Sequence, residues 1–195
     1  LNNKLHQRVG NRIGEISSGE ACIKVIDKYI PAGAYKLTVD NVSRLSVGDN
    51  IEIRKPVTEK WIKFMKMDNL VRDGKAQTWI KAGKFLITER TIAAIDGNII
   101  TLTVPLIDCY DSNYTDDNTT IVVANNVGRL KQCGVENIRI ESPAQAVNHS
   151  KALYYALRIN GEDCWAKDIN AMETMESIGI GGRRITLQQV NVIRK

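Results

Sequence analysis

Apolar and polar residues alternate along much of this 195-residue chain, which is the pattern of β-strands that bury one face. The alternation is clearest in residues 22–27, 35–39 and 51–54. Turn-forming Gly, Pro, Asp and Asn residues occupy the intervals at 31–33 and 48–50. The N-terminal half is therefore predicted to consist mainly of short strands joined by tight turns.

One hairpin and one short helix are also predicted in this half. Residues 91–104 form the hairpin, because Asp96-Gly97 supplies the positive φ that its turn needs. Thr58 followed by an acidic residue opens a helix over 58–67. Its apolar positions at i, i+3 and i+4 are Trp61, Phe64 and Met65. This face is predicted to cover core; an exposed Trp61 would instead indicate a ligand platform.

The C-terminal third contains a repeat with a period of 21 residues. Three of its positions are Leu157, Ile159 and Gly161, which recur as Ile178, Ile180 and Gly182. Residues 164–171 recur at 185–192, and a third copy at 133–140 precedes them with ten extra residues between. Short β-rich repeats of this length are typical of solenoids. The leucine ladder of leucine-rich repeats is missing, so the repeat predicts a parallel β-helix.

These patterns divide the chain into three segments. Residues 1–21 are polar and irregular and are predicted to be a leader. Residues 22–120 form a β-rich N-terminal unit that carries the helix, and residues 121–195 form the coils, with a loop at 142–153. A coil cannot bury its apolar face alone. We therefore expect the native protein to continue beyond Lys195, or another piece to cover that end.

Composition adds limits to the possible functions. Hydrophobic residues make up 43% of the chain and charged residues 25%, as in soluble globular proteins. No run of 18 apolar residues occurs, so no membrane span is expected. The 27 Lys and Arg residues are scattered among 22 acids, which argues against a nucleic-acid partner. The most basic stretch, 54–66, is predicted to be a solvated segment, with attraction to an acidic polymer as the alternative.

The four cysteines show no metal-type spacing. Cys133 and Cys164 share one repeat position and should stack on adjacent coils. A stacked pair of buried free thiols is favoured over a disulfide, because same-facing side chains on a ladder seldom reach disulfide torsions. Asn137, Asp168 and Gln189 also share a position and predict a ladder of stacked polar side chains along the solenoid.

The segments 163–169, 177–182 and 184–190 resemble coils of the pectate-lyase superfamily. Residues 31–39 and 45–56 resemble the N-terminal part of uncharacterised bacterial members of that superfamily. The resemblance implies an all-β fold: a right-handed parallel β-helix with an N-terminal antiparallel β-rich unit and one short helix. It does not imply a reaction, because one fold supports many chemistries.

What the resemblance implies about function is a secreted, periplasmic or cell-surface bacterial protein whose partner is a polysaccharide. The leading hypothesis is the N-terminal portion of a polysaccharide lyase or glycoside hydrolase. The alternative is a non-catalytic carbohydrate-binding or structural β-helix module. Lyases of this superfamily use acidic residues that hold Ca²⁺ and a basic residue that removes a proton, so Ca²⁺ is a possible cofactor. The sequence leaves the oligomeric state open.

Six residues are candidates for the site on the outer face of the coils. The catalytic candidates are Arg184, Arg183, Glu173 and Glu176, and the substrate-binding candidates are His149 and Trp165. Arginine suits bidentate recognition of carboxylates, and the glutamates lie in a bend between two strands. A solvated surface group is the favoured interpretation of each charged residue, and a functional role is the alternative. Trp165 is either an outward platform for a sugar ring or an inward core aromatic.

Overall fold

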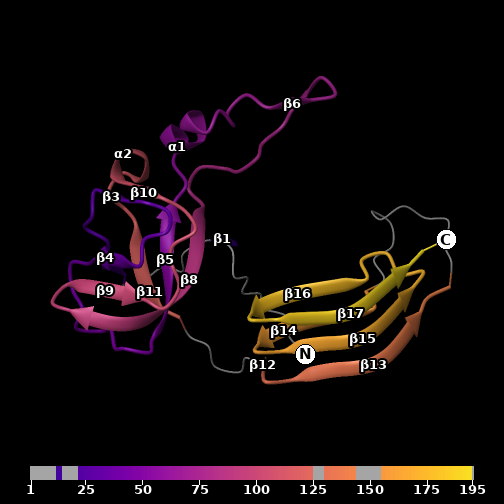
Figure 1. The fold of residues 1–195 in the computed structure, drawn as a ribbon. Helices are drawn as coiled ribbons and strands as arrows, with labels where there is room; N and C mark the ends of the chain where they lie inside the picture. Colours follow the sequence, from indigo (N-terminus) through magenta and orange to yellow (C-terminus); the bar gives the residue numbers. More distant parts are fainter. Residues whose placement is uncertain (1–11, 15–21, 125–129, 144–154, 195) are drawn as a thin grey trace. The chain divides into compact units, whose positions relative to one another are not determined.

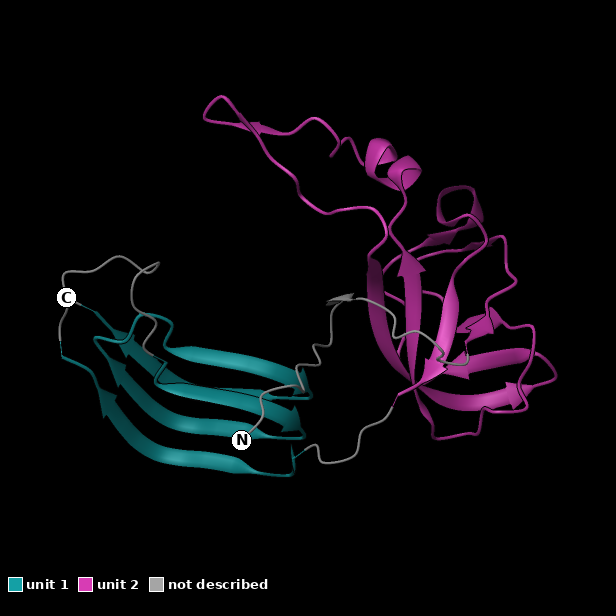
Figure 2. Ribbon diagram, turned by 180° about the vertical axis from the view of Figure 1, so that it is seen from behind, with its two compact units in different colours: residues 1–9, 127–195 teal, residues 10–126 magenta. Residues whose placement is uncertain are grey.

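The computed structural model describes residues 12–14, 22–124, 130–143 and 155–194. The chain divides into two compact units, which are described separately (Figure 2). We call residues 10–126 the antiparallel unit and residues 127–195 the coil unit. No helix in the described part of the chain is long and apolar enough to cross a membrane.

A curled sheet forms the body of the antiparallel unit (Figure 1). Its strands run in the order β2-β11-β5-β8-β9-β4, and β1 pairs with β8. They are β1 (Arg12–Gly14), β2 (Ile23–Lys24), β4 (Lys36–Thr38), β5 (Asn50–Pro56), β8 (Phe85–Asp96), β9 (Ile99–Leu102) and β11 (Thr120–Val123). The predicted hairpin is confirmed as the β8–β9 pair, with Gly97 at φ 55°. The inner face of the curled sheet holds the main apolar core. Its members include Ile51, Ile100 and Ile121, which are fully buried.

Shorter elements surround this sheet. Strand β3 (Tyr29–Ile30) pairs with β10 (Tyr110–Asp111), which leads into helix α2 (Ser112–Thr115). Helix α1 (Glu59–Phe64) lies within the predicted range 58–67. The Thr58 hydroxyl accepts the N–H of Trp61 at 3.0 Å and caps its start. Strands β6 (Val71–Arg72) and β7 (Lys75–Ala76) form a small hairpin.

The buried face of α1 differs from the predicted one. Trp61 and Ile62 are buried, whereas Phe64 is 59% and Met65 41% exposed. Burial of Trp61 agrees with a helix that covers core. The helix is only six residues long, so its two inward positions are enough to anchor it over Val57 and its neighbours. The other two predicted members of the face are left in solvent.

Two segment boundaries also differ from the prediction. Strand β11 pairs antiparallel with β5 and β2, so residues 121–123 belong to the antiparallel unit and do not begin the coils. Strand β1 lies inside the predicted irregular leader 1–21, and the rest of that leader lies outside the described residues. Both differences come from pairing with distant strands, which local sequence does not report.

Two parallel sheets form the coil unit. One contains β12 (Leu130–Lys131), β14 (Leu157–Glu162) and β16 (Ile178–Arg183), and the other contains β13 (Gly134–Glu141), β15 (Trp165–Met172) and β17 (Thr186–Ile193). Leu157 pairs with Ile178, so the 21-residue repeat is confirmed as the register between coils. The chain is thus mostly β with stacked parallel strands. A closed right-handed solenoid stays a prediction.

Residues with a left-handed backbone bend each coil at fixed positions. Asn137, Asp168 and Gln189 have φ of 57°, 52° and 52° and interrupt the pairing of β13, β15 and β17. The predicted stack at this position is therefore a column of bends. The amide hydrogen bond along the stack lies nearby, where Asn191 Nδ2 donates to Asn170 Oδ1 at 3.3 Å.

The middle coil supplies the buried interior of this unit. Cys164, Ala166, Ile169 and Ala171 are 3% exposed or less. Their register partners on the flanking coils, such as Ile138, are much more exposed, at 38% in that case. The middle coil is thus buried by the coils on its two sides, as expected of a solenoid in which a coil cannot bury its apolar face alone.

The stacked cysteines are free thiols, as predicted, but only Cys164 is buried. Cys133 is exposed, so the predicted burial of both thiols is wrong. Each Sγ bonds the carbonyl oxygen two residues earlier: Cys133 bonds Lys131 O at 3.2 Å, and Cys164 bonds Glu162 O at 3.4 Å. The repeated contact shows that the two residues occupy equivalent places at the corner between the two sheets.

Candidate functional site

Arg183 and Arg184 lie in a network of ion pairs on the coil unit. Arg184 binds Asp163 through two parallel bonds, Nε to Oδ1 at 2.5 Å and Nη2 to Oδ2 at 2.8 Å. Its Nη2 also donates to Glu162 Oε1 at 2.6 Å, and Arg183 Nη2 donates to Glu162 Oε2 at 2.8 Å. Lys131 Nζ lies 3.8 Å from Glu162 Oε2. Three cations thus surround two carboxylates.

The coil register explains why these side chains meet. Glu162 on β14 lies directly beside Arg183 on β16, because they are partners in the parallel pairing. Asp163 and Arg184 follow in sequence at the corner, where both have a left-handed backbone. Sequence analysis missed Glu162 as a member of the site. The signal was present, since the same 21-residue spacing that aligned the apolar positions places each acid beside one arginine.

Electrostatics hold the network in its charged form. Burial acts to raise the pKa of Glu162, but hydrogen bonds from Arg183 and Arg184 outweigh it and leave that pKa lowered. The hydrogen bond from Arg184 lowers the pKa of Asp163 as well. Its two carboxylate partners raise the pKa of Arg184. The acids are therefore ionised at neutral pH, and Arg184 keeps its proton.

Trp165 takes the outward of the two orientations left open by the sequence. Its side chain is 37% exposed, whereas its neighbours Cys164 and Ala166 are buried. A Cβ on Gly134, its register partner, would lie 1.9 Å from the indole atom Cε2. The indole therefore occupies the space that only a glycine at 134 leaves open. Its Nε1 donates to Glu136 Oε1 at 2.7 Å, which fixes the ring on the surface.

Polar groups surround this fixed indole. Thr186 is the register partner of Trp165 on the other side, and Lys167 lies between Glu136 and Gln188. Only one residue separates Trp165 from Asp163 of the ion network. An exposed aromatic face bordered by hydrogen-bonding and charged side chains is the arrangement that suits a sugar ring, since the ring has apolar C–H faces and a polar rim.

The other predicted residues lie elsewhere or have structural contacts. Glu173 follows β15 with φ 57°, and its N–H donates to Ile193 O at 2.9 Å. Glu176 accepts a hydrogen bond from the Tyr155 hydroxyl, and this bond raises the pKa of Tyr155. His149 lies outside the described residues. Of the six candidates, the structure places Arg183, Arg184 and Trp165 around one corner of the coils.

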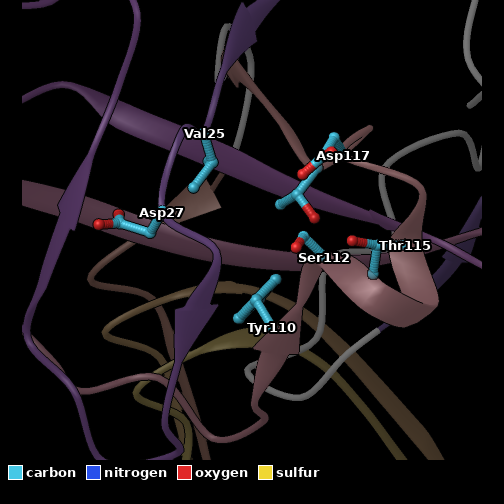
Figure 3. A pocket seen from close by; sticks show the side chains of 7 residues that line it. Val25, Asp27, Tyr110, Ser112, Thr115 and Asp117 are labelled. Atoms are coloured by element: carbon cyan, nitrogen blue, oxygen red, sulfur yellow. The ribbon is translucent and has the colours of Figure 1, made fainter.

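The antiparallel unit also contains a small pocket (Figure 3). Its lining is Val25, Asp27, Tyr110, Ser112, Thr115, Asp117 and Thr119. The carboxylate of Asp27 points away from the other labelled side chains and accepts the Thr38 hydroxyl at 2.9 Å. Asp117 is engaged by Lys28 Nζ at 2.9 Å. Burial raises the pKa of Tyr110 to about 12, so its phenol stays neutral. The pocket's acidic groups thus serve local structure.

Calcium would need several oxygen ligands around one point. Within the described ranges, no group of three or more His, Cys, Asp or Glu side chains is arranged to hold a metal ion. The two clustered carboxylates, Glu162 and Asp163, are already paired with arginines. These residues do not fit a calcium centre, and we assign no step to a metal.

Comparisons with known proteins give distant structural likenesses. No family model matches the chain, and no curated protein matches it. The tailspike gp61 of Pseudomonas phage phi297 aligns over 90% of this chain and 31% of its own, with 11% identity and a TM-score of 0.46. The gp54 tailspike of Acinetobacter baumannii bacteriophage AP22, solved in complex with A. baumannii capsular saccharide, aligns over 93% and 34%, with 12% identity and a TM-score of 0.42.

A third likeness is the tailspike gp49 of Pseudomonas phage LKA1, which aligns over 78% of this chain and 22% of its own, with 14% identity and a TM-score of 0.35. The chain spans about a third or less of the length of these structures. The comparisons do not name the pectate-lyase superfamily, so that resemblance stays a prediction.

Proposed function

We propose that the coil unit binds a polysaccharide on the outer face around Trp165. One observation carries the proposal: the indole is exposed and held in a fixed orientation by Gly134 and by Glu136. A ring fixed before binding loses little conformational freedom when a ligand stacks on it. Thr186, Lys167 and Gln188 supply hydrogen-bonding groups at its border.

The ion network supports the same proposal by extending the surface. Arg184 and Asp163 are half-exposed, with side-chain exposures of 57% and 41%. Their mutual hydrogen bonds keep both groups in place at the corner next to Trp165. A charged and rigid border of this kind is suited to hydroxyl groups of a sugar, which can both donate and accept hydrogen bonds.

The electrostatics favour binding over catalysis as a lyase or glycoside hydrolase. A glycoside hydrolase needs one carboxyl group with a raised pKa as general acid. Glu162 and Asp163 instead have lowered pKa values, because the arginines stabilise their charged forms. A lyase needs a base that accepts a proton, and the raised pKa of Arg184 makes it a poor one. Arg183, Arg184, Glu173 and Glu176 as catalytic residues therefore remain a sequence-based prediction.

A polysaccharide ligand implies a protein that acts outside the cell or at a cell surface. This agrees with the location that the resemblance implies, and both belong to the proposal. A requirement for Ca²⁺ is part of the catalytic alternative, and the experiment below tests it.

The test is a binding and activity screen of the purified chain against neutral and acidic polysaccharides, with and without Ca²⁺. Affinity electrophoresis measures binding, absorbance at 235 nm detects β-elimination, and a reducing-end assay detects hydrolysis. We expect binding that Trp165→Ala abolishes and that Trp165→Phe retains in part, with neither product signal. Binding that is indifferent to Trp165→Ala would contradict the proposed site, and new product would establish the catalytic alternative.

A further inference from the structure

The excursion between β5 and β8, residues 57–84, carries most of the net charge of the chain. It contains seven Lys and Arg residues and three Asp and Glu residues, a net charge of +4 out of +5. Six of these cations are exposed: Lys60, Lys63, Lys66, Arg72, Lys75 and Lys81. Figure 1 shows α1 and the β6 hairpin standing away from the curled sheet of their unit. This excursion is thus a projecting basic surface.

Two exposed aromatic rings lie on the same excursion, and each is backed by a second ring. Phe64 is 59% exposed and packs on Tyr114 with ring centroids 4.3 Å apart. Trp79 is 45% exposed and packs on Trp61 at 5.6 Å. Large apolar side chains that remain in solvent while held in place indicate a contact surface. Their inner partners prevent them from folding back onto the core.

The base of the excursion is rigid. Val57, Trp61, Ile62 and Ile80 form a separate buried apolar cluster under α1. Lys55 lies below them with its side chain 3% exposed, and its Nζ sits 5.0 Å from the centre of the Trp61 ring. That Nζ also donates to Asp108 Oδ2 and to Cys109 O, each at 2.9 Å. The projecting surface is therefore built on an ordered foundation.

We propose that residues 57–84 form a second binding surface, one that takes an acidic polysaccharide by pairing its carboxylates with the exposed lysines and stacking its sugar rings on Trp79 and Phe64. Charge complementarity favours an anionic ligand. The two supported aromatic rings favour a ligand whose own rings can stack on them. The choice of a glycan rests on the proposed function of the coil unit. The surface itself lies in the other unit and is independent of Trp165.

Two other anionic partners fit the surface less well. A nucleic-acid site would show a dense cationic stripe, whereas Glu59, Asp68 and Asp73 lie among these cations. A membrane-binding helix would present a broad apolar face to the lipid. Helix α1 turns Trp61 and Ile62 inward and is only six residues long.

The test measures binding of the purified chain to polygalacturonate, and dextran serves as the uncharged polymer. A random-sequence DNA duplex and phosphatidylserine vesicles represent the two competing classes of anionic partner. We expect polygalacturonate binding that weakens as salt is added. The triple variant Lys60→Gln, Lys63→Gln, Lys66→Gln should weaken it about tenfold, and Trp79→Ala also about tenfold. The matched controls are Lys24→Gln, Lys36→Gln, Arg44→Gln for charge and Tyr35→Ala for an exposed ring; both should bind as the wild type does.

Four outcomes would overturn the inference: equal loss in the controls, tight binding of the duplex or the vesicles but not of polygalacturonate, no dependence on salt, or no binding. Trp165→Ala, measured in parallel, separates the two proposals. Loss of polygalacturonate binding in the excursion variants but not in Trp165→Ala would support this surface, and the neutral polymers of the screen test the coil site separately. Dextran binding that is lost only in Trp165→Ala, together with no polygalacturonate binding by any form of the chain, would support the coil site and contradict the surface of residues 57–84. All substituted side chains are exposed, and melting curves check that each variant is folded.

Discussion

The indole of Trp165 fills the space in front of Gly134, its partner on the neighbouring strand. An added Cβ at 134 would come within 1.9 Å of the ring. We therefore predict that Gly134→Val displaces the indole, breaks its bond to Glu136 and reduces polysaccharide binding as strongly as Trp165→Ala does. Trp165 is the single tryptophan of the coil unit, so its indole N–H resonance reports the displacement directly.

The control for that experiment is Gly179→Ala. Its added Cβ would lie 3.3 Å from Arg158 Cγ, the far part of a flexible side chain that can move. The Trp165 resonance should stay in place in this variant. An unchanged resonance in Gly134→Val would show that position 134 does not constrain the ring.

Ile169 is the central residue of the coil interior, with 0% of its surface exposed. Ile169→Asp places a charge among apolar side chains and is expected to unfold the coil unit. Ile169→Ala should lower the free energy of unfolding by about 2–5 kcal/mol. Ile138→Asp changes the same column one coil away, where the side chain is 38% exposed, and should cost much less. Urea unfolding monitored at Trp165 measures all three, and equal losses at 138 and 169 would argue against stacked coils.

Glu162 and Asp163 make the stability of the coil unit depend on acid. Both pKa values lie below the ordinary 4.5 and 3.8. Groups with a lowered folded-state pKa stabilise the fold above their unfolded pKa, and that stabilisation is lost as pH falls through the folded value. The free energy of unfolding of the coil unit, measured by urea unfolding with Trp165 as the probe, should therefore be constant near neutrality. It should decline below about pH 4.5.

The variant Glu162→Gln tests the source of that decline. Its side chain is only 8% exposed, so loss of its charge should lower stability at neutral pH by about 2 kcal/mol. The remaining pH dependence should be shallower, because one of the two responsible carboxylates is gone. A pH profile identical to that of the wild type would assign the acid sensitivity to other groups.

Asp168 bends strand β15 with φ 52°, a conformation that β-branched residues resist. Asp168→Val should therefore destabilise the coil unit by about 1–2 kcal/mol, whereas Asp168→Gly should be neutral or stabilising. Lys167→Val, at the adjacent exposed strand position, serves as the control and should have little effect. Chemical denaturation of the three variants decides the point, and tolerance of valine at 168 would contradict a left-handed bend there.

Sequence reasoning worked best where structure depends on local repetition. The spacing from Leu157 to Ile178 gave the strand register, because stacked coils must place equivalent residues together. Asp96-Gly97 gave the β8–β9 turn for an equally local reason. The arginines were identified, but their partner Glu162 was overlooked although the same spacing contained it.

Features that depend on distant contacts could not be read from the sequence. Strand β11 was assigned to the coils, because its pairing with β5 joins residues far apart in the chain. The facing of Trp165 stayed open, because the choice depends on a glycine 31 positions earlier. Phe64 and Met65 were expected on a buried face, but α1 packs on the core through Trp61 and Ile62.

The bends at the corners also allow successive coils to differ in length while their strands stay aligned. Gly134 and Trp165 are partners across 31 residues and Trp165 and Thr186 across 21, yet β13 and β17 pair with β15 over the same stretch of its residues. Ten extra residues are thus accommodated between two coils without a shift in any strand face. A protein built this way can gain or lose a whole coil by duplication or deletion and keep its surface columns aligned, whereas a single inserted residue within a strand would turn its outer face inward.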